Sequence, residues 1–315
     1  MELRHLRCFL AVAEELHFAR AAERLHIEQS PLSRAIKELE EDVGAQLFVR
    51  TTRSTRLTRA GRLFLEHVPR IFTALQQARD SVKAATNGFH SQLRVALSDG
   101  IPPSRFSTFL ASCRQEEPEI EIRLFEVPLA QQIKGLHDDL YDAGFARSDE
   151  VGDGIVALPV WSDPLMVAVP ERHPLLMYKC IPLEELLRYP LVMGDLHACE
   201  GYARQIERVL RQVDQEPLIA ERAASVDLMM ALVAAGFALG LAGASQISAC
   251  HEPNVVARPL AGKAPMLITY LLHLDDEPTE PLARFIERLG NLEERSGDKT
   301  RNVLSDPDDS EEIEP

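Results

Sequence analysis

The spacing of hydrophobic side chains predicts three short helices within the first 44 residues. The first is marked by apolar residues that recur every three or four positions: Leu3, Leu6, Leu10, Ala13 and Leu16. A short alanine-rich helix follows over residues 19–25. Ser30 and Pro31 suit the cap and the first position of a third helix, which ends near Gly44. This order, with a tight turn before a polar-faced helix, is typical of a helix-turn-helix, which places its last helix in the DNA major groove.

Polar side chains cluster at the start of the third helix, where helix-turn-helix proteins place the residues that contact bases. The amide of Gln29 can pair with adenine and the guanidinium of Arg34 with guanine, because each can form two aligned hydrogen bonds. The spacing alone leaves an alternative open, namely a three-helix protein-binding domain with a solvated polar face.

The segment after Gly44 favours nucleic acid. Residues 43–65 contain five arginines and no acid, and hydroxyl side chains alternate with arginine over 51–58. Such a composition suits a two-stranded wing, in which arginines neutralise phosphates and hydroxyls donate to the DNA backbone. We therefore expect DNA contacts from the following residues: Gln29, Ser30, Pro31, Ser33, Arg34, Lys37, Arg50, Arg53, Thr55 and Arg56.

Motifs spread over about 60 residues resemble the winged helix-turn-helix of LysR-type transcriptional regulators. The matching residues, in chain order, are Leu3, Leu6, Phe9, Phe18, Ala21, Ala22, Leu25, Gln29, Ser30, Leu32, Ser33, Ile36, Leu39, Glu40, Gly44, Leu47, Phe48, Arg50, Leu57, Thr58, Ala60 and Gly61. Two positions depart from the family pattern. Ala19 stands where a Ser or Thr usually caps the second helix, so we expect that cap to be lost. Glu28 replaces a usual Ser, and its carboxylate is expected to weaken DNA binding or shift site preference.

The resemblance implies what the protein does. LysR-type regulators are bacterial, cytoplasmic proteins that bind promoter DNA sequence-specifically, respond to a small-molecule effector and contact RNA polymerase. They are not enzymes and carry no cofactor. We expect the same of this chain, with the helix-turn-helix domain over 1–58, a linker helix over 59–89 and an effector-binding domain over 90–295.

The linker helix is expected to run from Thr58 to about Gly88, with a bend at Pro69. Its apolar residues follow a 4-3-4-3-4 spacing, which is typical of a seam between paired helices: Phe64, Val68, Ile71, Leu75, Ala78 and Val82. The resemblance implies that this seam joins two chains into a dimer, within a homotetramer. Packing against the chain's own body is the alternative.

From Leu93 onward, short apolar runs alternate with helical segments, which indicates an α/β body with largely parallel sheets. The predicted strands cover residues 93–97, 120–127, 142–145, 155–160, 165–169, 191–193, 237–241 and 266–272. The predicted helices cover residues 104–115, 130–136, 183–187, 200–211, 226–235 and 280–292. The length suits two lobes with a cleft between them that binds a small molecule.

The body resembles the LysR-type effector domain, which is related to type 2 periplasmic binding proteins. The resemblance rests on residues 94–95, 142–145, 165–169, 173–175 and 233–236. It implies one lobe over 90–161 and 266–295 and a second over 162–265. It also implies effector contacts from Ser98, Asp99, Gly100, Leu129, Arg147, Met193, Gly194 and Gly243. Arg147 could bind an anionic effector or form a salt bridge with Asp99 or Glu126, whereas Leu129 and Asp99 argue against a simple carboxylate ligand.

The distribution of charge decides how the net charge is interpreted. The chain carries 34 Lys and Arg against 49 Asp and Glu, a net charge of −15. Residues 1–65 carry +2, the tail over 296–315 carries −5, and the body between them carries −12. The acidity therefore does not exclude DNA binding by the head. The tail, rich in Asp, Glu, Ser and Pro, is expected to be disordered.

Other chemistry receives little support from the sequence. The five cysteines are scattered, which excludes a disulfide scaffold. Cys199 lies in a region resembling that of the redox cysteine in peroxide-sensing family members, but no second thiol follows until Cys250, so an inert thiol is favoured.

No secretory signal is visible, and the uncharged segment 228–250 contains too many glycines and polar residues for a membrane span. No nucleotide-binding, hydrolase or metalloprotease motif is present, so we expect no catalytic or metal site. The competing hypothesis is a ligand-binding or enzyme-like α/β protein with an appended helical head.

Overall fold

The computed structural model describes residues 1–50, 54–98 and 100–303, except the side chains of Pro103 and of residues 292–303. Within it the chain forms two compact units, residues 1–82 and the residues from Lys83 onward. The helix α4 contains the boundary between them, and each unit is described below by itself. Arg53, Asp99 and residues 304–315, all of which carry sequence predictions, lie outside the described residues.

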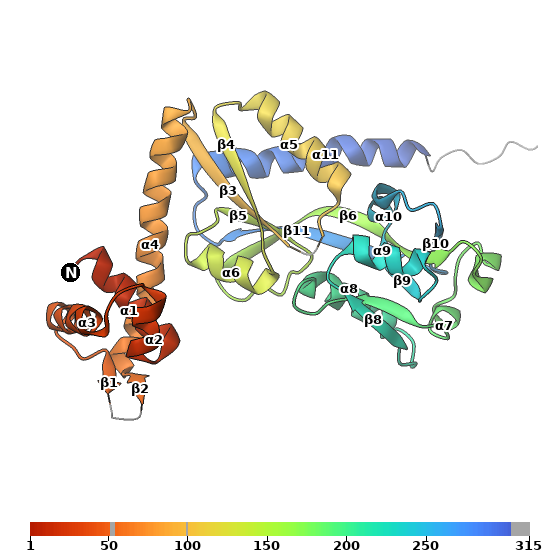
Figure 1. Ribbon diagram of the computed structural model, residues 1–315. Coiled ribbons are helices and arrows are strands. Elements are labelled where there is room, and N and C mark those ends of the chain that lie inside the picture. Colours follow the sequence, from red (N-terminus) through yellow and green to blue (C-terminus); the bar gives the residue numbers. More distant parts are fainter. Residues whose placement is uncertain (51–53, 99, 304–315) are drawn as a thin grey trace, which may run out of the picture. The chain divides into compact units, whose positions relative to one another are not determined.

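The N-terminal unit contains the predicted helices and the predicted two-stranded wing (Figure 1). Its elements are α1 (Leu3–Glu15), α2 (Phe18–Arg24), α3 (Gln29–Val43), β1 (Phe48–Arg50), β2 (Thr55–Leu57) and the greater part of α4 (Arg59–Thr86). The wing strands pair antiparallel, with Phe48 opposite Leu57 and Arg50 opposite Thr55. The structure therefore confirms the order of elements that the sequence predicts for the head.

Two helix starts differ from the predictions. Glu28, whose backbone is extended, occupies the N-cap of α3, so Ser30 is already helical and Pro31 is the third helical residue. The helix α2 has a cap after all, because the Nδ1 atom of His17 accepts a hydrogen bond from the backbone N–H of Arg20 at 3.4 Å. Both differences arise because several neighbouring residues of a short polar segment can occupy the N-cap. The packing of the helix decides which of them does so.

An aromatic cluster forms the core of the head and includes part of α4. The ring centre of Phe9 lies 5.3 Å from that of Phe48 and 5.0 Å from that of Phe64. Val68, one turn further along α4, is fully buried in the same core. Hence the first two residues of the predicted seam contribute to the head's own core. The later seam residues are more accessible: Ile71, Ala78 and Val82 are exposed and Leu75 is half-buried.

The junction between the wing and α4 is closed by Thr58 and requires a glycine. The hydroxyl of Thr58 donates to the carbonyl of Gln46 at 2.7 Å and accepts from the N–H of Gly61 at 2.9 Å. The N–H of Thr58 donates to the carbonyl of Leu47 at 2.9 Å. A Cβ atom at Gly61 would overlap that same carbonyl oxygen. Only glycine therefore allows the first turn of α4 to approach the wing this closely.

The second unit is an α/β body (Figure 1). In chain order its elements are β3 (Ser91–Leu97), α5 (Pro103–Glu116), β4 (Ile120–Glu126), α6 (Leu129–His137), β5 (Ala143–Ala146), β6 (Ile155–Pro170), the 3₁₀ helix η1 (Pro174–Met177), α7 (Leu183–Leu186), β7 (Leu191–Gly194), α8 (Glu200–Leu210), β8 (Ile219–Ala223), α9 (Val226–Ala234), β9 (Leu239–Gly243), α10 (Ala244–Cys250), β10 (Val255–Pro259), β11 (Met266–Leu274) and α11 (Glu280–Val303). Among these, η1, β8, α10 and β10 were not predicted.

The sheet corrects two predictions. The strand order is β4-β3-β5-β11-β6-β9-β7-β8, with β10 also paired to β6. The segments predicted as separate strands over 155–160 and 165–169 form the single strand β6, because Ser162, Asp163 and Pro164 continue the antiparallel register with β11. The pairs formed by β3 and β7 are parallel, whereas those of β6 and β11 are antiparallel. The sheet is therefore mixed, with antiparallel pairing at its centre.

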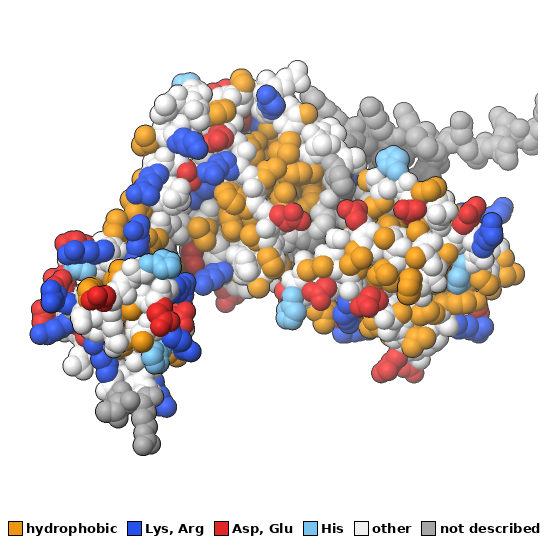
Figure 2. All heavy atoms as spheres, in the orientation of Figure 1, with side chains coloured by type: hydrophobic (Ala, Val, Ile, Leu, Met, Phe, Trp, Pro, Cys, Tyr) orange, Lys and Arg blue, Asp and Glu red, His pale blue; other side chains and the backbone are white. Residues whose placement is uncertain are grey.

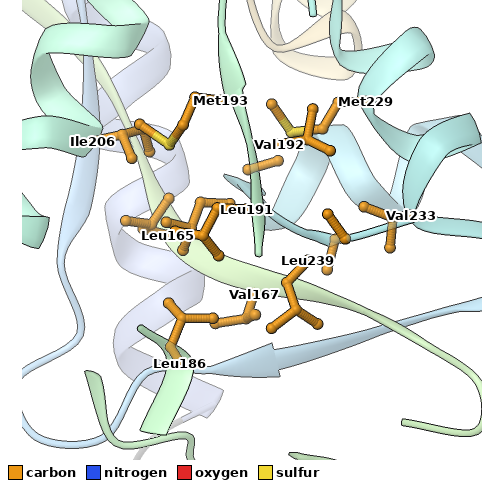
Figure 3. Close-up of a cluster of buried hydrophobic side chains, with 14 of the residues drawn as sticks. Leu165, Val167, Leu186, Leu191, Val192, Met193, Ile206, Met229, Val233 and Leu239 are labelled. Carbon is orange, nitrogen blue, oxygen red and sulfur yellow. The ribbon is translucent and has the colours of Figure 1, made fainter. Parts of the chain in front are cut away.

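The body contains separate hydrophobic cores, and we define its lobes by two of them. In one lobe the ring of Phe145 stacks on Trp161 at 5.0 Å, and Phe109 and Phe285 pack around them. The core of the other lobe, shown in Figure 3, is built from the following residues among others: Leu165, Val167, Leu186, Leu191, Val192, Met193, Ile206, Met229, Val233 and Leu239. The strand β6 contributes Trp161 to the first core and Leu165 to the second, so it passes from one lobe into the other.

The C-terminal helix is longer than expected. Helix α11 extends to Val303, so residues 296–303 are helical rather than part of a disordered tail. Glu293, Glu294 and Arg295 are good helix formers, whereas Ser296, Gly297 and Asp298 are not, so the composition of this segment does not explain the extension.

An Asp142→Ala variant is expected to lower the free energy of unfolding of the body by about 2 kcal/mol, because charged hydrogen bonds in partly buried sites contribute on this scale. The carboxylate of Asp142 accepts from the Nη2, Nε and backbone N–H of Arg94, at 2.6, 3.1 and 2.7 Å. Urea denaturation followed by circular dichroism measures the change. The control is Glu185→Ala, which removes a single ion pair with the exposed side chain of Arg188 and should cost under about 0.5 kcal/mol. Equal losses in the two variants would contradict the prediction.

Candidate nucleic-acid interface and ligand cavity

The helix α3 separates its apolar and polar residues onto opposite faces. Leu32, Ile36 and Leu39 are fully buried against α1 and α2. The opposite face contains the predicted DNA-contacting residues of this helix: Gln29, Ser30, Pro31, Arg34 and Lys37 are exposed, and Ser33 is half-buried. The helix is thus held from one side, and its polar face is accessible along its first three turns.

The cationic groups on this face differ in whether they interact with other side chains of the protein. The Nζ atom of Lys37 lies 3.6 Å from Glu41, and both side chains are exposed. Arg34 has no ion pair or hydrogen bond to any described residue, so its guanidinium is available to a partner. Glu28 is also exposed, and its side chain does not cap the helix, so its carboxylate stands at the edge of the same face.

The wing presents its arginines in two different ways. The guanidinium of Arg50 stacks over the ring of Phe18 at 4.2 Å and lies 3.9 Å from the carboxylate of Glu40. The same carboxylate accepts the backbone N–H groups of Leu47 and Phe48 at 2.8 and 3.1 Å, so it also anchors the start of β1. Arg50 is therefore braced against the head.

Arg56, on β2, is exposed and forms no hydrogen bond or ion pair with a described residue, and its neighbour Thr55 is half-buried. Figure 2 shows basic and acidic side chains intermixed over the visible side of the head. DNA binding by the head thus depends on where individual cations lie rather than on a uniformly basic surface.

A cavity of about 720 Å³ opens within the body. Its wall is formed at the ends of strands and the starts of helices. Ser98 and Gly100 follow β3, and Gly194 ends β7. Cys199 and Ser225, which are the N-caps of α8 and α9, also line it. Helix N-termini concentrate unpaired backbone N–H groups, so this wall can bind a polar ligand.

The loop at Gly100 is fixed by two long side chains. Gly100 has a φ of +63°, a left-handed conformation that glycine adopts readily. Its carbonyl accepts from Nε2 of Gln246 at 2.7 Å and from Nη2 of Arg147 at 3.4 Å. The other amide atom of Gln246 accepts from the N–H of Gly243 at 3.2 Å, which connects β9 and α10 to the cavity wall.

Arg147 lies beneath the cavity wall. It is fully buried, and its guanidinium carbon lies 5.7 Å from the ring centre of Tyr202. The hydroxyl of Tyr202 donates to the carbonyl of Leu241, and burial raises the pKa of this hydroxyl strongly above its usual value. Tyr202 therefore remains neutral and contributes an aromatic surface to the lining.

Two family models together match most of the chain. Residues 3–62 match the bacterial regulatory helix-turn-helix protein of the lysR family, and residues 86–292 match the LysR substrate binding domain. The chain belongs to the LysR family of transcriptional regulators. It is a LysR-type DNA-binding regulator with an effector-binding domain, as the motifs of the head predicted. The alternatives of an enzyme-like protein and of a protein-binding head are set aside.

Known transcriptional regulators are similar over nearly the whole chain. The regulator XapR of Escherichia coli K12 is 30% identical over 290 residues, covering 91% of this chain and 97% of the relative. The hca operon activator HcaR of the same organism is 30% identical over 296 residues, covering 93% and 99%. Among solved structures, full-length CbnR in complex with its target DNA has a TM-score of 0.71 at 27% identity, covering 92% of this chain and 99% of that chain.

Only part of the predicted effector set lines the cavity of this LysR-type protein. Ser98, Gly100 and Gly194 do so. Met193 instead points into the core of its lobe (Figure 3). Leu129 is buried in a small separate cluster with Leu272.

Arg147 and Gly243 also lie outside the lining of the cavity. Arg147 supports the wall through Gly100 and Tyr202, as described above. A Cβ atom at Gly243 would overlap the carboxylate of Asp163, which accepts from the Ser245 hydroxyl at 2.6 Å. Both residues therefore shape the region around the cavity without forming its surface.

Several lining residues were not predicted. They include Phe106, Glu126, Tyr202, Ser225, Asp227, Gln246 and Cys250. Two signals were available. Ser225 is a usual N-cap residue directly before the helix predicted over 226–235, and the pair Gly243 and Gln246 has the spacing of an N-cap and a third helical position. The others come from segments that are unremarkable in sequence and meet only in the folded body.

The two thiols on the cavity wall are hydrogen-bonded. The Sγ atom of Cys199 donates to the carbonyl of Ala224 at 3.2 Å, and that of Cys250 donates to the carboxylate of Asp227 at 3.3 Å. Burial, together with Asp227, raises the pKa of Cys250 to about 11. Cys250 is therefore protonated at neutral pH and a poor nucleophile.

Neither a metal centre nor a membrane span is found in the described part of the chain. No group of three or more His, Cys, Asp and Glu side chains lies close enough there to hold a metal ion. None of the helices in the same residues is long and apolar enough to cross a membrane.

Proposed function

We propose that two heads of a dimer, within a homotetramer, bind a partly palindromic promoter site, and that an effector in the cavity changes the bend of the bound DNA. The observation that carries the proposal is the accessible polar face of α3, with Arg34 uncommitted to any described residue. The two-fold symmetry of a dimer matches the symmetry of such a site. The similarity to CbnR, whose structure is solved in complex with its target DNA, supports the DNA-binding part of the proposal.

The proposed DNA contacts divide into two groups. Gln29, Ser33 and Arg34 read base edges in the major groove, since they lie at the start of α3. The remaining contacts go to phosphates and to the minor groove. This group consists of Ser30, Pro31, Lys37, Arg50, Arg53, Thr55 and Arg56.

The exposed part of α4 is the proposed dimer contact. Ile71 and Val82 are 37% and 69% exposed, although both are large and apolar. They lie on the same helical stripe as Leu75 and Ala78, and a second α4 would bury this stripe. The body would then be free to bind the effector, and the assembly to contact RNA polymerase. We place this activity in the cytoplasm of a bacterial cell, where promoter DNA is found.

DNA affinity is expected to fall by about 10³-fold or more between 50 and 200 mM salt. A dimer that uses three to five cations per head neutralises roughly six to ten phosphates, and the released counterions make binding this sensitive. Titration of labelled promoter DNA with full-length protein, at several salt concentrations, measures the slope. Binding that is absent at every salt concentration, or does not respond to salt, would contradict the proposed function.

A further inference from the structure

The described lining of the body cavity contains acids and no Lys or Arg. Glu126, the last residue of β4, and Asp227, in the first turn of α9, both line it. Both residues are exposed, so their carboxylates are accessible to a ligand. The charged side chains in the described lining are therefore all acidic.

The remainder of the lining is largely apolar. It includes Ile101, Phe106, Tyr202, Val226 and Met229, from both lobes of the body. Two aromatic rings and several aliphatic side chains suit a ligand with a flat apolar part. A volume of about 720 Å³ lies within the range of sites that enclose small organic molecules.

The positive groups near the cavity are helix N-termini and two arginines outside its lining, Arg147 and Arg222, which donate to the carbonyls of Gly100 and Gly194 at 3.4 and 3.0 Å. The N-termini of α8 and α9 each contribute about half a positive charge. Each first turn also contains an acid, namely Glu200, paired with Arg204 at 2.5 Å, and Asp227. The buried guanidinium of Arg147 lies behind the wall, directed at the Gly100 carbonyl and the Tyr202 ring.

We propose that this cavity binds a small amine, with the ammonium group beside Asp227 and Glu126 and an apolar, flat body against Phe106 and Tyr202. A carboxylate of the same shape is repelled, because it would enter beside like charges without a lining cation to pair with. This inference rests on the proposed role of the cavity as the effector site. It specifies that the charge of the site selects a cationic effector rather than an anionic one.

Three indole compounds that differ mainly in charge test the proposal: tryptamine, which is cationic, tryptophol, which is neutral, and indole-3-acetate, which is anionic. Isothermal titration of the full-length protein gives a dissociation constant for each. We expect tryptamine to bind at least tenfold more tightly than indole-3-acetate, with tryptophol between them. Asp227→Asn should weaken tryptamine binding about fivefold to tenfold and leave tryptophol within twofold. The amide keeps an acceptor for Cys250, so the local hydrogen bond is preserved.

Two further variants control the experiment. Glu126→Gln removes the other carboxylate of the lining and should weaken tryptamine binding in the same direction. Asp214→Asn removes an exposed acid that does not line this cavity and should change no dissociation constant. Indole-3-acetate binding as tightly as tryptamine, equal weakening of all three probes, or no binding of any probe at millimolar concentration would overturn the proposal. Salt-dependent DNA binding in the same preparation shows whether the regulator itself is intact, so a wrong effector class is distinguished from a wrong function.

Discussion

A Gly61→Ala variant is expected to lose at least tenfold in DNA affinity and about 2–3 kcal/mol in the stability of the N-terminal unit. The added Cβ would overlap the carbonyl oxygen of Leu47, and a backbone carbonyl has no rotamer by which to move away. Insertion of a methyl group into a well-packed site costs on this scale. The carbonyl also accepts the N–H of Thr58, so relief of the clash must displace the wing. DNA titration and urea denaturation measure the two effects.

Gly290→Ala is the matched control. Gly290 also lies inside a helix, but a Cβ atom there would meet no other atom within 4 Å. Alanine should therefore leave DNA binding unchanged and stabilise α11 by up to about 1 kcal/mol, because glycine is a poor helix former. If Gly61→Ala binds DNA as tightly as Gly290→Ala does, DNA binding does not require the close approach of α4 to the wing.

Arg34→Ala is expected to change which DNA sequence the protein prefers. Loss of one bidentate contact to a base costs about 1–3 kcal/mol, or roughly fivefold to 150-fold in affinity for the preferred site. Affinity for unrelated sequences should fall much less. Arg56→Ala should instead weaken binding to all sequences by a similar factor and reduce the salt slope by about one unit per head, because the wing arginine is proposed to contact phosphate.

A panel of promoter duplexes that vary one base pair at a time measures both effects. Arg172→Ala, which removes an exposed arginine from the body, controls for the general loss of positive charge. A uniform loss for Arg34→Ala, or a changed preference for Arg56→Ala, would reverse the assigned roles.

The head was largely predictable because its signals are local. A helix of 3.6 residues per turn assigns buried Leu32 and exposed Arg34 to opposite faces from spacing alone. Helix caps were less predictable. The cap of α2 at His17 was missed because the polar ring of histidine was not considered among the usual cap residues.

The body was predictable in its elements but not in their connection. The segment around Pro164 has the composition of a turn, yet it forms part of β6, because pairing with β11 continues along it. Pairing between distant strands is decided by the whole sheet. For the same reason β8 and β10, whose residues are not consistently apolar, were missed.

The sequence by itself determined the class of this protein. The apolar spacing of the head and linker and the alternation of strands and helices in the body arise from near neighbours in the chain, and they predicted the elements. The LysR class was predicted from the resemblance of the ordered motifs to that family. Only the tertiary structure decided which residues surround the cavity. Folding brings Asp227 and Glu126 into one lining and places Arg147 behind it, although the three lie far apart in the chain. The charge presented to an effector depends on distances between such residues, and local sequence patterns do not contain those distances.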